Sequence, residues 1–514
     1  MRLLRSTAIV GVLTMASRVL GLVREMLLAA ALGAGVVTDV FLTAFQFPNL
    51  FRRIFAEGAF NSAFVPLYAG KLESGEQDEA IRFARQVMSV LLTTMVVLVV
   101  GAQFLMPWLM YALGPGFVGE PGPFELAVLL TQITMPYLLM MSLSAMLSGV
   151  LNSHGRFAVA AAAPVLLNLF LIAILYFSPA EGENMALHLS IGISLSGVAQ
   201  LAWLFAACRA TGLRLSLQLP RLSPGVRRLI VLGVPGALAA GVTQINILVT
   251  SSIATMEISA RSWLYYADRL YQLPLGVVGI AMGVVLLPTL SGRVRAGAVE
   301  AASNAMNRAL EISMALTLPA ATALAVIPVF IATGIYQRDE FTPNDAAMVG
   351  YALIPFAIGL PAFVLIKVLS PGFFAREDTL TPMKFATVGV VVNLTVGLAL
   401  FFGPLGFVGL AIATALAGWV NAILLAVTLW RRRLLEPDRR LIGKIPRILL
   451  ACAALAGFLL LAEHHAEMLR AHLLDSTLLT LLAVCGVGLV VYGAAALMTG
   501  ALRLSEVRGA LKRS

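Results

Sequence analysis

The chain has 514 residues, of which 60% are hydrophobic and only 12% are charged, and its mean hydropathy is +0.92. Soluble globular proteins carry about 25% charged residues, so these values exclude a soluble fold and predict a polytopic helical membrane protein. The formal net charge is +10, but the basic residues stand in short clusters between apolar runs, as the positive-inside rule predicts. This distribution argues against a nucleic-acid partner and indicates membrane lipids instead.

Apolar runs of about 20 residues, long enough to cross about 30 Å of hydrocarbon, recur along the whole chain. We predict an all-α fold with about fourteen membrane-spanning helices. Arg2 and Arg5 followed by an apolar run resemble a signal peptide, but hydrophobicity resumes after Arg18, so an uncleaved first helix is predicted. The spans are expected near residues 6–32, 36–67, 83–111, 124–150, 157–178, 185–209, 226–255, 262–290, 301–331, 345–372, 383–401, 406–431, 446–466 and 474–502.

The charges of the connecting segments predict the orientation of the chain. With the N-terminus in the cytoplasm, the two termini and the connections on the same side hold 27 Lys and Arg residues. The opposite side holds only Arg261, Arg338 and Arg470. Because Lys and Arg accumulate in cytoplasmic loops, both termini are predicted to be cytoplasmic.

An internal repeat divides the chain. A short pattern after the second span recurs after the eighth with an offset of 222 residues, and the same offset relates the ends of the fourth and tenth spans. The related positions are Pro66, Gly70, Lys71 and Gly75 with Pro288, Gly292, Arg293 and Gly297, and Leu147-Ser148 with Leu369-Ser370. We therefore predict two pseudo-symmetric six-helix lobes, residues 1–215 and 216–432, followed by a C-terminal helix pair at 433–514. Repeats of this kind are typical of transporters, with the substrate site between them.

Several charged residues lie inside the predicted spans, where each costs roughly 2.5–3.5 kcal/mol on insertion scales unless it faces protein or water. On the first helix, Arg18 and Glu25 are seven residues apart and share a face, so they are candidate partners. Arg24 points about 120° away from Arg18. Arg24 is therefore a candidate for a charge that faces a cavity.

The second span and the eighth carry further charges. Arg53 and Glu57 are four residues apart and are expected to form an ion pair, which leaves Arg52 without a local partner. In the eighth span Asp268 is adjacent to Arg269, and neighbours on a helix do not face each other.

These arginines suit a phosphorylated ligand. Guanidinium groups bind phosphate with two parallel hydrogen bonds and stay protonated, so three or four of them in a cavity suit a pyrophosphate. The candidates are Arg24, Arg52 and Arg269, with Arg18 if Glu25 is engaged elsewhere. The alternative is that an arginine near a helix end extends to the lipid headgroups. Asp39, at the external start of the second span, is a candidate to close a gate against a cavity arginine.

Other polar residues predict no catalytic or metal centre. Cys208, Cys452 and Cys485 lie in or at the ends of apolar spans, so neither a disulfide framework nor a metal site is predicted. No cofactor is expected, and a coupling ion is not identified. Asn168 and Asn393, in the fifth and eleventh spans, are expected to hydrogen-bond between helices rather than to bind an ion.

Four motifs carry a family resemblance: SRVLGLVRE at 17–25, FPNLFRRIFAEGAFNSAFVP at 47–66, YYADRLYQLP at 265–274 and LSPGFFARED at 369–378. They resemble the MurJ (MviN) family of lipid II flippases, within the multidrug/oligosaccharidyl-lipid/polysaccharide exporter superfamily. The resemblance covers the whole chain, and the segment 47–66 is its specific part.

The resemblance implies a bacterial inner-membrane protein that moves lipid II, the undecaprenyl-pyrophosphate-linked peptidoglycan precursor, by alternating access. It implies that Arg18, Arg24, Arg52 and Arg269 face a central cavity, with Asp39 and Glu57 as contributing acids. Glu25 and Asp268 are further candidates for gating or supporting acids. It also implies that the C-terminal helix pair holds the lipid tail, and it makes cell-wall synthesis proteins candidate partners.

Three alternatives to this function remain from the sequence. Two are transporters: a flippase for another polyprenyl-linked oligosaccharide, and a cation-coupled drug exporter, which should have a less cationic cavity. The third is a membrane-embedded enzyme that acts on the lipid carrier. The external loops are short and offer no catalytic pairing of acids and histidines, so an enzyme is not predicted.

Overall fold

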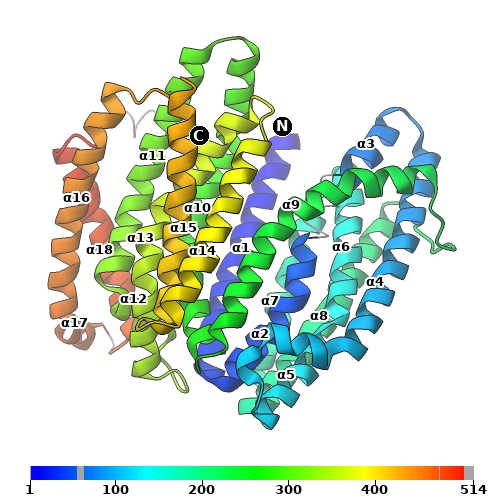
Figure 1. Cartoon of the computed structure of the whole chain (residues 1–514), viewed down its shortest axis with the longest axis horizontal. Coiled ribbons are helices and arrows are strands. Elements are labelled where there is room, and N and C mark those ends of the chain that lie inside the picture. The colour runs from blue at the N-terminus through cyan, green and yellow to red at the C-terminus, as the bar shows by residue number, and fades with distance from the viewer. Residues whose placement is uncertain (1, 55–62, 474, 503–514) are drawn as a thin grey trace. The chain divides into compact units, whose positions relative to one another are not determined.

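The computed structural model describes residues 2–54, 63–473 and 475–502, which form helices joined by turns and loops and include no strand (Figure 1). The helices in chain order are α1 (Arg2–Leu32), α2 (Val36–Arg52), α3 (Val65–Glu73), α4 (Gln77–Leu113), the short 3-10 helix η2 (Pro115–Phe117), α5 (Pro121–Thr134), α6 (Pro136–Ser153), α7 (Phe157–Phe177), α8 (Gly182–Ala210), α9 (Pro224–Ala254), α10 (Ala260–Arg295), α11 (Val299–Val326), α12 (Pro328–Tyr336), α13 (Pro343–Phe374), α14 (Leu380–Phe401), α15 (Gly406–Arg431), α16 (Arg439–His464), α17 (Ala466–His472) and α18 (Thr477–Met498).

The predicted all-α, polytopic fold class is confirmed. Ten of the helical segments in the described part are long and apolar enough to cross a membrane, and the remaining predicted spans fall on α1, α2, α9 and α10. The predicted second span differs in detail, because α2 ends at Arg52 and α3 begins only at Val65. The predicted fourth span is divided into α5 and α6, because Pro136 has no N–H to continue the backbone ladder.

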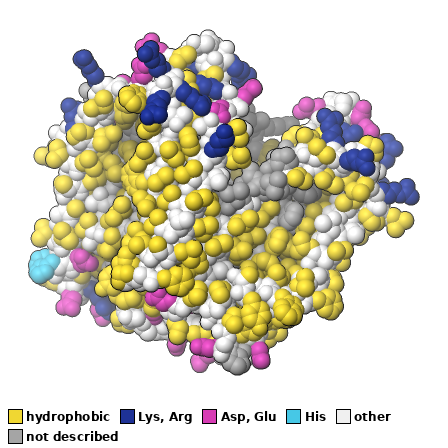
Figure 2. Space-filling view, viewed as in Figure 1, with side chains coloured by type: hydrophobic (Ala, Val, Ile, Leu, Met, Phe, Trp, Pro, Cys, Tyr) yellow, Lys and Arg dark blue, Asp and Glu magenta, His cyan; other side chains and the backbone are white. Residues whose placement is uncertain are grey.

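The chain forms two compact units. Unit 1 comprises residues 1–262 and 338–341, and unit 2 comprises residues 263–337 and 342–514. Side chains in the middle of the face shown in Figure 2 are largely hydrophobic, and Lys and Arg gather near one end of the helices. The division at 215 and 432 stays a prediction from the sequence.

The internal repeat has a counterpart in backbone conformation. Gly75 and Gly297, offset by 222 residues, both have positive φ (81° and 69°). Gly155 and Glu377, at the same offset, also have positive φ (73° and 62°). Positive φ is costly for a residue such as glutamate, so the turn geometry is kept in the second copy even where glycine is absent.

Helix packing repeats in the same order. In unit 1, α4 packs on α6, α6 on α8, and α7 on α8; in unit 2, α11 packs on α13, α13 on α15, and α14 on α15.

The loop before α14 is fixed by Asp378, whose carboxylate accepts hydrogen bonds from the Thr381 backbone N–H (3.0 Å) and from Arg432 (2.7 Å). The Thr381 N–H first, and then Arg432, lower the pKa of Asp378 to about 2.

The C-terminal helix pair belongs to unit 2, where α16 packs on α11 and α18, and α18 also packs on α12 (Figure 1). A charge network with a buried centre, Glu311 and Lys444, joins α16 to α11. Glu311 of α11 contacts Arg308 on its own helix and Lys444 and Arg440 of α16, the last at 3.1 Å. Arg308 also contacts Asp438, which caps α16 by accepting a 2.7 Å hydrogen bond from the Leu441 N–H. We call these five side chains, Arg308, Glu311, Asp438, Arg440 and Lys444, the Glu311 network.

Candidate functional site

Arg24 lies on α1 within a polar contact between α1 and α7. Its Nη1 donates a 3.0 Å hydrogen bond to Oδ1 of Asn168 on α7, and its Nη2 contacts the Glu25 carboxylate. Asn168 in turn donates from Nδ2 to the Ser17 carbonyl at 3.0 Å. The prediction that Asn168 hydrogen-bonds between helices is confirmed, and Arg24 has partners that helix geometry alone did not indicate.

Arg52 is the last residue of α2 and belongs, like Arg24, to unit 1. Its Nε donates to Asn49 Oδ1 at 3.2 Å, one turn earlier on α2. The charges of Arg52 and Arg24 both act on the hydroxyl of Tyr137 on α6, which is 2% exposed and hydrogen-bonds Gln200 of α8. In unit 1, α7 packs on α1, α6 and α8, and α2 packs on α6 and α8, so the helices that carry these side chains are neighbours.

The other charges of the first two predicted spans have different surroundings. Glu25 is buried against Arg24, and Arg18 is exposed, so the structure pairs Glu25 with its neighbour rather than with Arg18. The expected ion pair between Arg53 and Glu57 involves a residue outside the described part of the chain, because Glu57 falls in the gap from 55 to 62.

Asp39 lies in the first turn of α2 and is 1% exposed. It accepts a 2.8 Å hydrogen bond from the Ser262 backbone N–H and a second one from the Ser262 hydroxyl. Arg261 is near enough for its charge to act on Asp39, and it donates to the Leu42 carbonyl at 2.9 Å. The arginine close to Asp39 is therefore Arg261, which the sequence placed in an external loop, and neither it nor Ser262 was among the predicted site residues.

Asp268 and Arg269 belong to unit 2 and lie on α10. The Arg269 guanidinium stacks over the Tyr265 ring, 4.6 Å from its centroid. Asp268 accepts hydrogen bonds from Gln272 and from the Tyr271 hydroxyl. The two side chains thus have different partners, as expected for neighbours on a helix. Whether they act on substrate stays a prediction.

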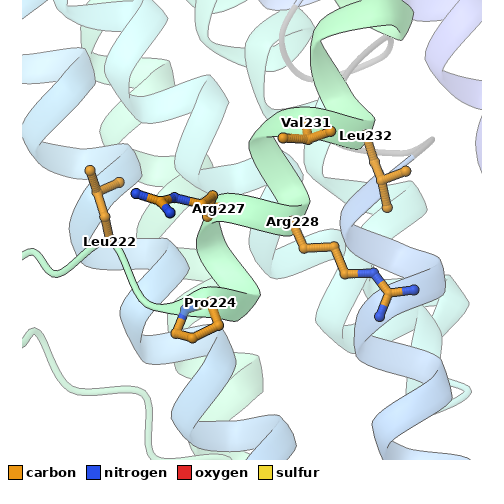
Figure 3. A pocket seen from close by; sticks show the side chains of 6 residues that line it. All are labelled: Leu222, Pro224, Arg227, Arg228, Val231 and Leu232. Carbon is orange, nitrogen blue, oxygen red and sulfur yellow. The ribbon is translucent and has the colours of Figure 1, made fainter.

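A groove of about 600 Å³ lies at the start of α9 in unit 1. It is lined by Leu222, Pro224, Arg227, Arg228, Val231 and Leu232 (Figure 3). The two arginine side chains point away from each other (Figure 3), because consecutive helix residues are 100° apart. None of the predicted site residues lines this groove, so its volume does not mark the candidate site.

The family model described as "Lipid II flippase MurJ" matches residues 28–479. The chain is 44% identical to the probable lipid II flippase MurJ of Rhizobium meliloti, over 100% of this chain and 97% of the relative. It is 33% identical to the lipid II flippase MurJ of Burkholderia cenocepacia, over 89% of this chain and 90% of the relative.

Solved structures agree on the fold. A lipid II flippase MurJ in an inward closed conformation matches with a TM-score of 0.76 and 22% identity, over 95% of this chain and 98% of that one. An inward-facing multidrug resistance MATE family transporter of the MOP superfamily matches with a TM-score of 0.67 and 15% identity, over 83% of this chain and 98% of that one. From the family model and the full-length relatives, the chain belongs to the MurJ family of lipid II flippases.

Proposed function

We propose that this protein moves lipid II from the cytoplasmic to the periplasmic leaflet of the bacterial inner membrane. The observation that carries the proposal is the match to the family, over residues 28–479 for the family model and over the whole chain for a relative. The part-buried Arg24, held by Asn168 and Glu25 in unit 1, supports it. Arginine fits this role because it stays protonated and binds a pyrophosphate with two parallel hydrogen bonds.

The proposed site residues keep the roles predicted from the sequence. Arg24 and Arg52 bind the pyrophosphate of the head group, and Arg18 and Arg269 are proposed as further head-group residues. Glu25 limits the net charge that Arg24 brings into the membrane, which lowers the cost of keeping it there without substrate. Asp39 acts at the external side, where its contact with Ser262 forms part of a gate.

Transport is proposed to follow alternating access between the two halves of the repeat. The polyprenyl tail stays in lipid, with α16 and α18 forming its groove. Both termini are proposed to be cytoplasmic, because 27 Lys and Arg residues lie on that side and three on the other. We propose transport without any covalent change to the lipid.

Lipid binding by the purified full-length protein tests this function. Lipid II should bind more tightly than undecaprenyl phosphate, which lacks the pyrophosphate-linked sugar, and incubation should release no phosphate. Loss of one charged contact should weaken lipid II binding by about 1.5–3 kcal/mol in Arg24→Ala and in Arg52→Ala. Arg209→Ala is the control, because Arg209 lies in the last turn of α8 and its guanidinium stacks on the Phe205 ring, 4.8 Å from the centroid.

The same variants should be tested for growth of a flippase-depleted bacterial strain, with protein levels checked by blot. Arg24→Ala and Arg52→Ala should fail to support growth, and Arg209→Ala should support it. Equal affinity for lipid II and undecaprenyl phosphate, or growth with both alanine variants at normal protein levels, would show that the proposed function or its site is wrong.

A further inference from the structure

Asn168 is the only amide side chain of α7, whose sequence is otherwise almost entirely apolar. It is 6% exposed. Burying an amide among apolar groups is unfavourable unless its hydrogen bonds are satisfied, and Asn168 satisfies both ends of its amide on α1. The oxygen accepts from Arg24 at 3.0 Å and the nitrogen donates to the Ser17 carbonyl at 3.0 Å.

The α1 surface is shaped to receive this amide. Ser17 and Arg24 are seven residues apart, close to two helical turns, so they lie on nearly the same face. Gly21 lies between them, and a Cβ there would be 4.0 Å from the Asn168 Nδ2. The small residue leaves room for the Asn168 side chain to reach both contacts on α1.

Asn168 and Glu25 hold Arg24 in different ways. Glu25 supplies a negative charge, which offsets the charge of the guanidinium. Asn168 supplies a neutral amide oxygen, which fixes the plane of the guanidinium without reducing its charge. A pyrophosphate needs both the charge and the orientation of the arginine fork.

We propose that Asn168 is a positioning residue for substrate binding, which sets the orientation of the Arg24 guanidinium toward the pyrophosphate. The proposal rests on the proposed function, because it assumes that Arg24 contacts the head group. Asn168 does not touch the substrate, and its effect passes through Arg24. Replacing it should therefore weaken head-group binding only while the arginine fork is present.

The test uses Asn168→Leu, which keeps the branched shape and the number of side-chain heavy atoms and removes both hydrogen bonds. Lipid II affinity of the purified full-length protein is measured in wild type, in Asn168→Leu, in Arg24→Lys and in the double variant. Asn168→Leu should weaken binding about tenfold in the wild-type background, the scale of one hydrogen bond to a charged group. It should weaken binding less than threefold in Arg24→Lys, because a lysine ammonium is a point charge without a fork to orient.

Gln132→Leu is the matched control. Gln132 is also an interhelical amide of unit 1, with a 2.9 Å hydrogen bond from its Nε2 to the Gln103 carbonyl, and its replacement should leave lipid II affinity unchanged. Equal losses from Asn168→Leu in both backgrounds would assign Asn168 a purely structural role and overturn the inference. Unchanged affinity in Asn168→Leu would overturn it as well.

The outcomes also separate this inference from the function on which it rests. If Arg24→Ala binds lipid II as wild type does, Arg24 is not a head-group residue, and the proposed site fails first. If Arg24→Lys binds more weakly while Asn168→Leu has no effect, only the role of Asn168 is wrong. Gly21→Val gives an independent check, since its larger side chain should displace the Asn168 amide and weaken binding as Asn168→Leu does.

Discussion

Removing the carboxylate at the centre of the Glu311 network should destabilise unit 2 strongly. The side chains of Glu311 and Lys444 are 7% and 5% exposed, so Glu311→Gln leaves the Lys444 ammonium buried without its carboxylate. Breaking a buried ion pair in this way costs about 3–5 kcal/mol. Lys444 lies near the start of α16, and its ammonium can extend toward the membrane surface. We therefore expect a loss of stability at the lower end of this range, about 3 kcal/mol.

The assay is reversible unfolding of the purified protein in mixed detergent, compared among Glu311→Gln, Lys444→Met and the double variant. The double variant should be more stable than Glu311→Gln, because no unpaired charge remains buried. Arg470→Ala is the exposed control: the Arg470 and Asp475 side chains are 48% and 81% exposed, so their ion pair should contribute about 0–1 kcal/mol. Wild-type stability in Glu311→Gln, or a double variant less stable than that single variant, would refute the reasoning.

Three further changes have expected outcomes. The pKa of Asp378 is lowered from 3.8 to about 2. The contribution of Asp378 to stability is therefore present above about pH 3.8 and is lost as the pH falls toward about 2. Asp378→Asn should remove this part of the pH dependence of Tm. Gly116→Ala should lower stability by about 1–3 kcal/mol, because the new Cβ would stand 1.7 Å from the Thr255 carbonyl oxygen. A cysteine at Gly403 should react with an impermeant thiol reagent added outside cells, and one at Pro437 should not.

Each of these has its own control. Above about pH 5, Tm should change with pH by the same amount in Asp378→Asn and in wild type. If the two proteins differed only above pH 5, the lowered pKa of Asp378 would not be the cause of the pH dependence. Gly101→Ala, in α4 with no atom within 4 Å of the new Cβ, should be neutral or slightly stabilising. Labelling of the Pro437 cysteine in intact cells, with Cys208, Cys452 and Cys485 replaced, would reverse the proposed orientation.

The sequence predicted the features that depend on local pattern. Apolar length and loop charge gave the fold class and the spans, and the 222-residue offset predicted turns that the structure shows to share positive φ at Gly75 and Gly297. The interhelical role of Asn168 followed from one polar residue in an apolar helix, and Asn393 likewise accepts a 3.2 Å hydrogen bond from Thr414 of the next helix.

Predictions from the sequence were wrong or missing where the contacting residues are far apart in the chain or have long side chains. Arg18 and Glu25 were expected to pair because they share a helix face, but Glu25 contacts its neighbour Arg24 instead. Ser262 contacts Asp39 across 223 positions of the chain. No periodicity links such residues, so contacts of this kind can be read only from the folded structure.

The Glu311 network has a consequence for the order in which helices enter the membrane during synthesis. Glu311 emerges with Arg308 three residues before it, so α11 carries its own counter-charge into the bilayer. Lys444 follows 133 residues later, on the order of 10 s at ribosomal rates, and between residues 439 and 462 the helix α16 has no acid of its own. Until α16 packs on α11, Lys444 has to extend to the membrane surface, so a fragment that begins after residue 432 should be less stable in the membrane until the earlier part of the chain is supplied.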